Sequence, residues 1–288
     1  MLFPNFKKRT VRTSGARINL VTAGEGPAVL LLHGYPETHA MWHKVAPALA
    51  RDYTVVCADL RGYGDSSKPK GLPDHSNYSK RAMALDMAEA MSALDHQRFH
   101  VVGHDRGGRV AHRLARDHGA RVRSLTVLDI SPTLKMYEST NLQFAKAYYH
   151  WFFLIQEAPL PEQMLAGMGP DYILKRLGRG KAGLKVFSKQ AMREYVRCFN
   201  PHSTCEDYRA AATIDLVHDR RDKAKLKMPV LALWGRQGVI EALFDCLADW
   251  REVASDVRGR ALACGHFIPE EKPAELLAAL RDFLARAG

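Results

Sequence analysis

The segment Gly103-His104-Asp105-Arg106-Gly107-Gly108 constrains this chain more than any other. It follows an apolar run at 99–102 and opens a helical pattern that continues to residue 115. A strand, a tight turn and a helix in that order form a nucleophile elbow, in which glycines allow close approach and one side chain stands at the top of the turn. We therefore expect Asp105 to stand at the end of a buried strand.

The residue at the top of the turn is an aspartate, where such elbows usually carry serine. A carboxylate that attacks a saturated carbon becomes an ester, so Asp105 changes the predicted chemistry from acyl transfer to alkyl transfer. Arg106 and Arg109 lie three residues apart at the start of the helix, where they share a face and where the helix N-terminus favours anions. Their guanidinium groups suit a substrate carboxylate, an interpretation that we weigh above an ion pair with a lid or loop acid.

The apolar runs predict the fold around this turn. Alternating residues at 10–23 predict an opening hairpin that turns at Ser14-Gly15. Continuous runs at 28–32, 54–58, 99–103, 125–129 and 229–234 are typical of strands buried on both faces of a parallel sheet. Amphipathic helical patterns lie near 41–50, 81–94, 107–118 and 273–287. We predict an α/β fold, with a mostly parallel sheet flanked by helices.

The alternation stops after Ile130-Ser131-Pro132. From there to about residue 222 the sequence is rich in aromatic residues, helical in pattern and without a clear buried strand. We interpret residues 132–222 as a helical lid over the carboxyl ends of the strands, where open α/β sheets bind ligands. Residues 1–131 and 223–288 would then form the core domain.

Two further residues complete a predicted catalytic set. His266 lies in a loop of small residues before the last helix and is the expected base that activates water. Asp129 ends a predicted strand and is the expected acid that orients His266, with a plain strand-end cap as the alternative. The other common acid position, Trp234-Gly235-Arg236-Gln237-Gly238, holds no aspartate, and Glu241 is a weak substitute.

The oxyanion of the second step needs donors as well. The backbone amides of Tyr35, in His33-Gly34-Tyr35-Pro36, and of Arg106 occupy the expected positions. The segment Asp59-Leu60-Arg61-Gly62-Tyr63-Gly64-Asp65-Ser66 is interpreted as scaffold.

The charge balance limits the choice of partner. The chain carries 42 Lys and Arg against 31 Asp and Glu, a formal net charge of +11. The basic residues are dispersed and are not interleaved with aromatic residues as in nucleic-acid-binding surfaces. A field that attracts a small anionic substrate suits the chain better than nucleic acid.

Cysteine usage and hydropathy point to a compartment. The five cysteines are scattered, odd in number and without CxxC spacing, which favours free thiols in a reducing cytoplasm over disulfides or a metal site. No run approaches the ~20 apolar residues of a membrane-spanning helix, and the start does not read as a signal peptide. We expect a cytoplasmic protein with no membrane partner and no metal.

The chain resembles the fluoroacetate dehalogenases, a haloacid-specific branch of the α/β-hydrolase superfamily, along nearly its whole length. The resemblance lies in His33-Gly34-Tyr35-Pro36-Glu37-Thr38, Gly103-His104-Asp105-Arg106-Gly107-Gly108-Arg109, Leu128-Asp129-Ile130, Tyr149-His150-Trp151, Cys205-Glu206-Asp207-Tyr208-Arg209 and Gly265-His266-Phe267. The related haloalkane dehalogenases and epoxide hydrolases usually carry tryptophan directly after the nucleophile, so Arg106 is the discriminating residue.

The resemblance implies a reaction and further site residues. It implies hydrolysis of a short 2-haloacid, with fluoroacetate giving glycolate and fluoride as the first candidate. It also implies that His150, Trp151 and Tyr208, all in the predicted lid, hold the departing halide with their N–H and O–H groups. Members of this family are commonly homodimers and need no cofactor.

Two alternatives stay open at this point. An epoxide hydrolase would use the same Asp105, His266 and Asp129, and lid tyrosines such as Tyr148, Tyr149 or Tyr172 would donate to the epoxide oxygen. A neutral epoxide gives the two arginines no purpose. A non-catalytic ligand receptor on the same fold is the second alternative, and the intact set of three residues argues against it.

Overall fold

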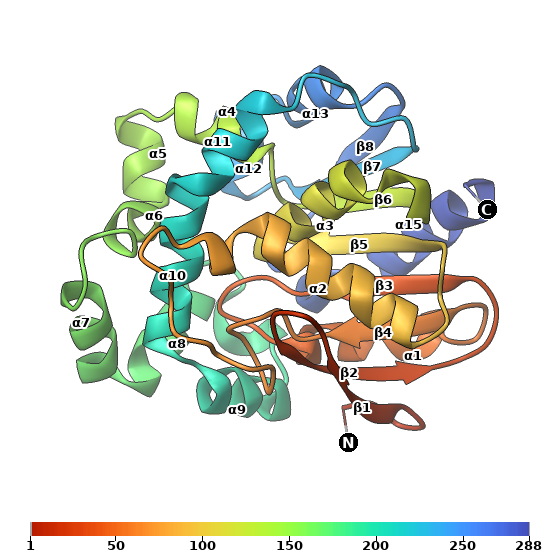
Figure 1. The fold of residues 1–288 in the computed structure, drawn as a ribbon, viewed down its shortest axis with the longest axis horizontal. Coiled ribbons are helices and arrows are strands. Elements are labelled where there is room, and N and C mark those ends of the chain that lie inside the picture. The colour runs from red at the N-terminus through yellow and green to blue at the C-terminus, as the bar shows by residue number, and fades with distance from the viewer. Residues whose placement is uncertain (1, 288) are drawn as a thin grey trace.

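A computed structural model describes residues 2–287, and a single eight-stranded sheet runs through them (Figure 1). The strand order is β1-β2-β4-β3-β5-β6-β7-β8, with β2 antiparallel to both of its neighbours and every pair from β4 to β8 parallel. The strands are β1 Lys7–Arg12, β2 Arg17–Ala23, β3 Ala28–Leu32, β4 Thr54–Ala58, β5 Phe99–His104, β6 Val122–Leu128, β7 Val230–Gly235 and β8 Val257–Leu262.

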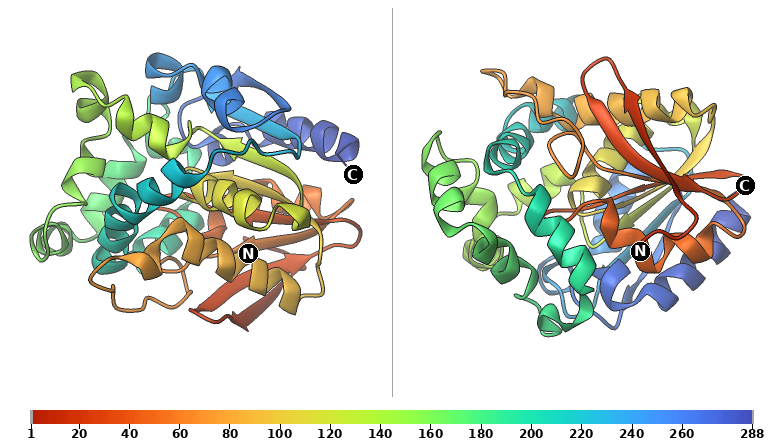
Figure 2. Two further views of the ribbon diagram at one scale, coloured as in Figure 1. Left: turned by 45° about the horizontal axis from the view of Figure 1, so that its top comes forward. Right: turned by 90° about the horizontal axis from the view of Figure 1, so that it is seen from below.

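Helices cover both faces of the sheet, with α2 and α3 on one face and α1 and α15 on the other (Figure 2). The α-helices are α1 Ala46–Leu49, α2 Lys80–Ala93, α3 Arg106–Asp117, α4 Thr133–Glu138, α5 Leu142–Ala147, α6 Tyr149–Phe153, α7 Leu160–Met168, α8 Pro170–Leu177, α9 Lys189–Cys198, α10 Pro201–Ala212, α11 Ile214–Arg221, α12 Val239–Leu243, α13 Cys246–Val253, α14 Ile268–Glu271 and α15 Pro273–Arg286. Short 3-10 helices occur at His39–Lys44, Ser76–Tyr78, Gly119–Arg121 and Gly183–Val186. The predicted α/β class with a mostly parallel sheet is confirmed.

The strand predictions agree with the sheet at its centre. The five continuous apolar runs correspond to β3, β4, β5, β6 and β7, and the hairpin at 10–23 corresponds to β1 and β2. β3 and β5 are buried along their whole length, as expected of strands covered on both faces. β8 was not predicted, because its sequence VRGRAL alternates exposed and partly buried positions at the sheet edge and has no apolar run.

The helical segment predicted near 41–50 is present in two pieces. The structure has a 3-10 helix at His39–Lys44 followed by the separate α1. Pro47 lies in the first turn of α1 and has no backbone N–H to continue a preceding helix, and its ring would meet the carbonyl of residue 43. The chain therefore restarts at Val45.

The interval between β6 and β7 contains helices α4 to α11 and, within the described chain, no strand of the sheet. Helices α5 to α10 gather at one end of the sheet, on the left in Figure 1. Our interpretation of residues 132–222 as a lid domain, separate from the core at 1–131 and 223–288, stays a prediction.

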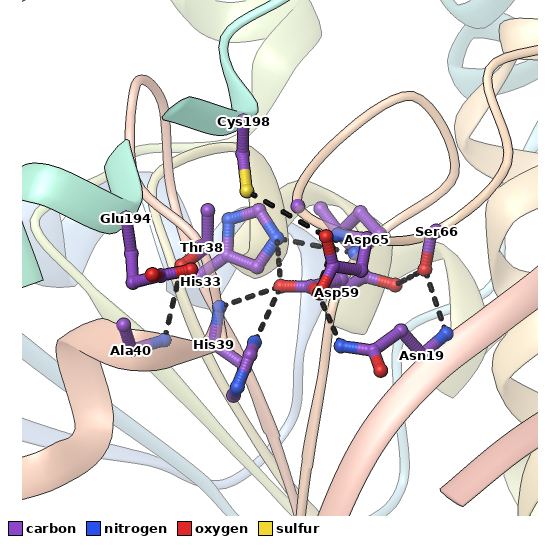
Figure 3. A network of polar contacts seen from close by, with 12 residues as sticks. Asn19, His33, Thr38, His39, Ala40, Asp59, Asp65, Ser66, Glu194 and Cys198 are labelled. Atoms are coloured by element: carbon purple, nitrogen blue, oxygen red, sulfur yellow. Dashed lines mark hydrogen bonds and ion pairs between the residues drawn. The ribbon is translucent and has the colours of Figure 1, made fainter. Parts of the chain in front are cut away.

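Asp59, directly after β4, fixes the neighbouring loops (Figure 3). Its carboxylate accepts hydrogen bonds from the Asn19 side chain at 2.8 Å, from the backbone and ring nitrogens of His39 at 2.8 Å each, and from the Asp65 amide at 2.9 Å. Burial would raise the pKa of Asp59, but the His39 ring outweighs burial and holds that pKa well below its usual value. These contacts fit the scaffold role that we assign to this segment.

All five cysteines are buried and unpaired in the structure. No helix within residues 2–287 has the length and apolar character needed to cross a membrane.

Candidate active site

Asp105 stands between β5 and α3 in a strained backbone conformation, with φ 46° and ψ −113°. A positive φ is costly for a residue with a Cβ, so the surrounding structure must hold it in place. Glycines allow the chain to pack closely around this turn. A Cβ on Gly107 would meet the carbonyl oxygens of Leu32 and His33, and one on Gly34 would lie 2.7 Å from the Asp105 Cβ. The chain thus makes the predicted strand-turn-helix elbow. Gly107 and Gly34 have no room for a larger side chain.

Asp105 is 4% exposed, and its carboxylate accepts a hydrogen bond from the Tyr35 amide, with 3.0 Å between that nitrogen and Oδ1. Burial would raise the pKa of Asp105, but the nearby His266, Arg109, His104 and Arg106 together outweigh burial and lower it. Asp105 is therefore an anion at neutral pH. Of the two amides predicted for the oxyanion hole, Tyr35 contacts this carboxylate; the hydrogen bonds of residues 2–287 include none from the Arg106 amide to it.

The turn that carries Tyr35 is held by its neighbour His33. The Leu60 amide donates to His33 Nε2 at 3.1 Å, so the ring proton lies on Nδ1, which donates to the Gly34 carbonyl at 2.9 Å. His33 thus joins the loops after β3 and β4, and it lies beside Asp59 (Figure 3). Tyr35 N–H is aimed at Asp105 by a rigid turn.

His266 and Asp129 form the predicted pair. Asp129 follows β6 with φ 53°, its Oδ1 accepts from the Gly235 amide at 2.8 Å, and its Oδ2 lies 2.6 Å from His266 Nδ1. Burial would lower the pKa of His266, but the hydrogen bond and charge of Asp129, with the charge of Asp105, raise it above its usual value. Since Nδ1 carries the proton shared with Asp129, Nε2 is the free position for accepting a proton from water.

Glu271 fixes the loop that holds His266. Its carboxylate accepts hydrogen bonds from the Gly265 amide at 2.8 Å and the Phe267 amide at 3.0 Å, on either side of the histidine. Sequence analysis assigned no role to Glu271. An acidic residue shortly after a Gly-His pair was the signal available.

A cavity of about 210 Å³ lies beside these residues. Its walls include Asp105, Asp129, His266 and Tyr35 from the strand ends, and His150 and Tyr208 from the helical insert. The structure thus brings six of the nine predicted site residues to one cavity. Trp151, Arg106 and Arg109 lie one layer further back: Arg106 covers the Tyr208 ring at 4.1 Å from guanidinium carbon to ring centroid, and Arg109 covers the Trp151 ring at 4.6 Å.

Arg106 is fully buried and is held by Asp207 on α10. Its Nε lies 2.7 Å from Asp207 Oδ2, and its Nη2 lies 2.9 Å from Oδ1 and 2.8 Å from the backbone carbonyl. Lys80 also pairs with Asp207, and both cations hold the pKa of this buried carboxyl low. An ion pair with a lid acid was the alternative that we weighed for the arginines, and Arg106 makes one, while its Nη1 has no partner.

Arg109 is buried without a carboxylate partner within the described chain. Its Nη1 donates to the Thr133 hydroxyl at 3.0 Å and the Ser131 carbonyl at 3.4 Å, its Nη2 lies 3.2 Å from the Met136 sulfur, and its Nε has no partner. Burial lowers the pKa of Arg109, and the charge of Asp105 opposes that effect. A buried cation facing a nucleophilic carboxylate is an expected place for a substrate anion.

The three residues that the resemblance assigns to the halide share one property. His150 Nδ1, Trp151 Nε1 and Tyr208 Oη are each buried, and none has a hydrogen-bond partner within residues 2–287. The Tyr208 ring centroid lies 5.8 Å from that of His150 and 6.5 Å from that of Trp151. We call these three atoms, with Arg106 Nη1 and Arg109 Nε, the donor cluster.

The donor cluster is costly without a ligand. A buried polar group left without a partner costs about 1–3 kcal/mol. Burial and the charge of Arg176 hold the pKa of His150 well below its usual value, so the ring is neutral, and burial raises the pKa of Tyr208, so the phenol keeps its proton. Within the described residues, the five atoms of the donor cluster therefore lie buried with no acceptor.

Three basic residues that sequence analysis missed line the cavity. Arg176, on α8, and Arg179 and Lys181, just beyond it, line the cavity. No ion pair within the described residues involves any of them. No motif distinguishes them from the other cations of the chain. Their contribution could be found only from the placement of α8 against the strand ends.

The tyrosines of the epoxide alternative are placed unequally. Tyr148 lines the cavity, Tyr149 is 45% exposed, and the Tyr172 hydroxyl accepts a hydrogen bond from the Tyr35 hydroxyl at 2.9 Å. Of the three, Tyr148 therefore stands nearest to the cavity.

Comparisons with known proteins agree with this geometry. The alpha/beta hydrolase fold family matches residues 27–273. A fluoroacetate dehalogenase from Burkholderia sp. is 45% identical over 99% of this chain and 96% of its own, and a soluble epoxide hydrolase from Corynebacterium sp. (strain C12) is 37% identical over 94% and 95%. A crystal structure from Nostoc sp. PCC 7120, provisionally described as an alpha/beta hydrolase, is 57% identical with a TM-score of 0.97 over 99% of both chains. The resemblance to fluoroacetate dehalogenases is confirmed.

Proposed function

The chain belongs to the alpha/beta hydrolase fold family, and from that premise we propose that it hydrolyses short 2-haloacids, with fluoroacetate and water giving glycolate and fluoride. The donor cluster carries this proposal, because both ends of a haloacid, the carboxylate and the departing halide, need hydrogen-bond donors. The 45% identity to a fluoroacetate dehalogenase from Burkholderia sp. supports the same substrate class.

In the first step, an oxygen of Asp105 attacks the α-carbon of the haloacid. The carbon–oxygen bond forms as the carbon–halogen bond breaks, and the halide leaves with the bonding electron pair. We assign the substrate carboxylate to Arg106 and Arg109, and the departing halide to His150, Trp151 and Tyr208. Each donor is already oriented before substrate binds, so little reorganisation is needed as charge develops on the halogen.

In the second step, His266 Nε2 takes a proton from water, and the resulting hydroxide attacks the ester carbonyl of Asp105. The Tyr35 amide, which already donates to Oδ1 of the resting carboxylate, stabilises the oxyanion. Collapse of this intermediate breaks the bond between the carbonyl carbon and the glycolate oxygen, and protonated His266 returns a proton to that oxygen. The net products are glycolate, halide and one proton.

Halide release tests this proposal. Wild type and Asp105→Ala are compared on fluoroacetate and chloroacetate with a halide-selective electrode. Fluoride release by wild type and none by the variant would support both the reaction and its nucleophile. Release of chloride but not fluoride would support the same two-step mechanism and would limit the substrates to haloacids whose carbon–halogen bond is weaker than the carbon–fluorine bond.

The epoxide alternative is favoured by one observation, the 37% identity to a soluble epoxide hydrolase from Corynebacterium sp. (strain C12). Diol formation from an epoxide such as styrene oxide, measured beside halide release, separates the two functions. Diol formation without halide release would replace our proposal. The cytoplasmic location and the homodimer stay predictions.

A further inference from the structure

Arg176 joins two helices of the insert through a contact that the proposed mechanism does not use. It extends from α8 to His150 on α6, with 3.1 Å between Arg176 Nη2 and His150 Nε2. Both residues line the cavity. Figure 1 shows α6 and α8 at the end of the sheet where the insert gathers.

This contact determines where the His150 proton lies. Every nitrogen of a guanidinium is a hydrogen-bond donor, so His150 Nε2 must be the acceptor and carries no proton. A neutral imidazole has one N–H, which is then on Nδ1. Burial, Arg176 and Arg179 all hold the pKa of His150 low, so the ring does not gain a second proton. The nitrogen that bears the proton is the one that is buried without a partner.

We propose that Arg176 is a positioning residue that fixes His150 in its Nδ1–H tautomer, so that a donor rather than a lone pair faces the departing halide. The inference rests on the proposed function, because it assigns the tautomer a purpose only if a halide leaves beside His150. In the opposite tautomer, the Nδ1 lone pair would face a developing anion. The site would then lose one hydrogen bond and gain a repulsion.

The one side-chain hydrogen bond that Arg176 makes within residues 2–287 is the bond to His150. Within residues 2–287 it has no carboxylate partner, its Nε is buried without an acceptor, and its guanidinium carbon lies 6.0 Å from the Tyr35 ring centroid. Arg179 provides a matched comparison. It carries the same charge and lines the same cavity, but it lies over the Tyr149 ring at 5.2 Å and makes no hydrogen bond to His150.

The test is the tautomer itself, read by NMR on protein labelled with 15N-histidine. The ring nitrogens of the two tautomers have separate chemical shifts, and His150→Gln identifies the His150 signals by their disappearance. In wild type we expect a protonated Nδ1 and an unprotonated Nε2. In Arg176→Met we expect the Nε2–H form to appear, whereas Arg176→Lys, which still offers a donor, restores the wild-type pattern. Arg179→Met should leave the tautomer unchanged.

Kinetics supply the second reading. Arg176→Met should lower the maximal rate of fluoride release about tenfold, the cost of one hydrogen bond to a charged group, and chloride release less, because chloride is the better leaving group. Arg179→Met removes the same charge from the cavity lining, so any loss should be equal for both halides and should appear mainly in KM.

Three results would overturn the inference. They are an Nε2–H tautomer in wild type, an unchanged tautomer in Arg176→Met, or the same tautomer change in Arg179→Met. If the Arg176 variant fails to fold, an Nε2–H tautomer in the wild-type spectrum would still overturn the inference. The spectrum also needs no turnover, so a wild-type protein that released no halide would refute the proposed function while the tautomer was still measured.

Discussion

The two halves of the site differ in how their polar atoms are satisfied. The triad, Asp105, Asp129 and His266, comes from strand ends, and none of its side-chain atoms is buried without a partner in the described chain. The donor cluster comes from α3 and the helical insert, and all five of its atoms lack an acceptor. The triad side chains are thus paired with one another or with backbone amides, whereas the donor cluster, to which we assign the substrate, has no partner within the described residues. Substitutions in the triad should therefore act by removing a contact within the protein. Substitutions in the donor cluster should act only on the binding and reaction of substrate.

Asp129→Asn should give the largest effect on the paired half. An asparagine cannot hold His266 in the required tautomer or stabilise its protonated form, and comparable substitutions reduce turnover by about 10⁴-fold. Alkylation of Asp105 should continue, so a rapid-quench assay should show one equivalent of fluoride per site and then a stop. Steady release at the wild-type rate would mean that His266 does not depend on Asp129.

Arg109→Leu should give the next largest loss, on the unpaired half. Fluoride release should fall by about 10–150-fold, the worth of a hydrogen bond between charged groups. The unfolding midpoint should not fall, because a buried charge without a counter-ion is replaced by an apolar side chain.

Arg113→Leu, one turn further along α3, is the matched control. Arg113 is bound to Asp117 at 3.1 Å, Asp219 at 2.7 Å and Asp222 at 2.6 Å. Its removal leaves those carboxylates unpaired, so the midpoint should fall while the folded fraction stays active. Calorimetry should show the larger stability loss in Arg113→Leu, and halide release should show the larger activity loss in Arg109→Leu. The opposite order in both measurements would contradict the distinction between paired and unpaired arginines.

Trp151→Phe should have a smaller effect of the same kind. The phenyl ring keeps the packing under Arg109 and removes only the unpartnered indole N–H. Fluoride release should fall about tenfold, and thermal stability should be unchanged or higher, since a buried donor without an acceptor is lost. A destabilised variant with full activity would place Trp151 among the packing residues.

The smallest effect is on pH dependence, where activity and stability should move in opposite directions. The pKa of His266 is raised in the folded state, so ester hydrolysis should increase as pH rises through this pKa and the base becomes neutral. The stabilisation from the His266–Asp129 pair is complete below the unfolded-state pKa of histidine, about 6.5, and is lost as pH rises through the folded pKa. As pH rises through this window, the rate of ester hydrolysis should increase while the free energy of unfolding decreases; rate and denaturation measurements over the same pH range check this. In Asp129→Asn, the pH dependence of the free energy of unfolding that comes from the His266–Asp129 pair should disappear.

Most of the paired half could be predicted from the sequence because local patterns encode it. Glycine spacing identified Asp105, and the end of a continuous apolar run identified Asp129, both close to their strands. His266 followed from its loop and its position before the last helix. The structure adds the contacts that hold each residue, such as Glu271 on both amides beside His266.

The unpaired half could not be predicted in the same way. His150, Trp151 and Tyr208 were assigned by resemblance, since an aromatic residue in a helical segment is equally suited to packing. Asp207 lay within a quoted motif, but its hold on Arg106 depends on where α10 meets α3. Arg176 had no signal at all, because its meaning depends on a contact to a residue 26 positions away in sequence. Side chains that converge from separate helices are visible only once the helices are placed.

Intact-mass analysis of His266→Ala after incubation with fluoroacetate tests the central claim most directly. If the substrate alkylates Asp105 and His266 acts only afterwards, one fluoride should be released per site. The protein should gain the mass of one carboxymethyl group, and peptide mapping should locate that group on Asp105. An unmodified protein that had released fluoride, or a modification on any other residue, would contradict the account.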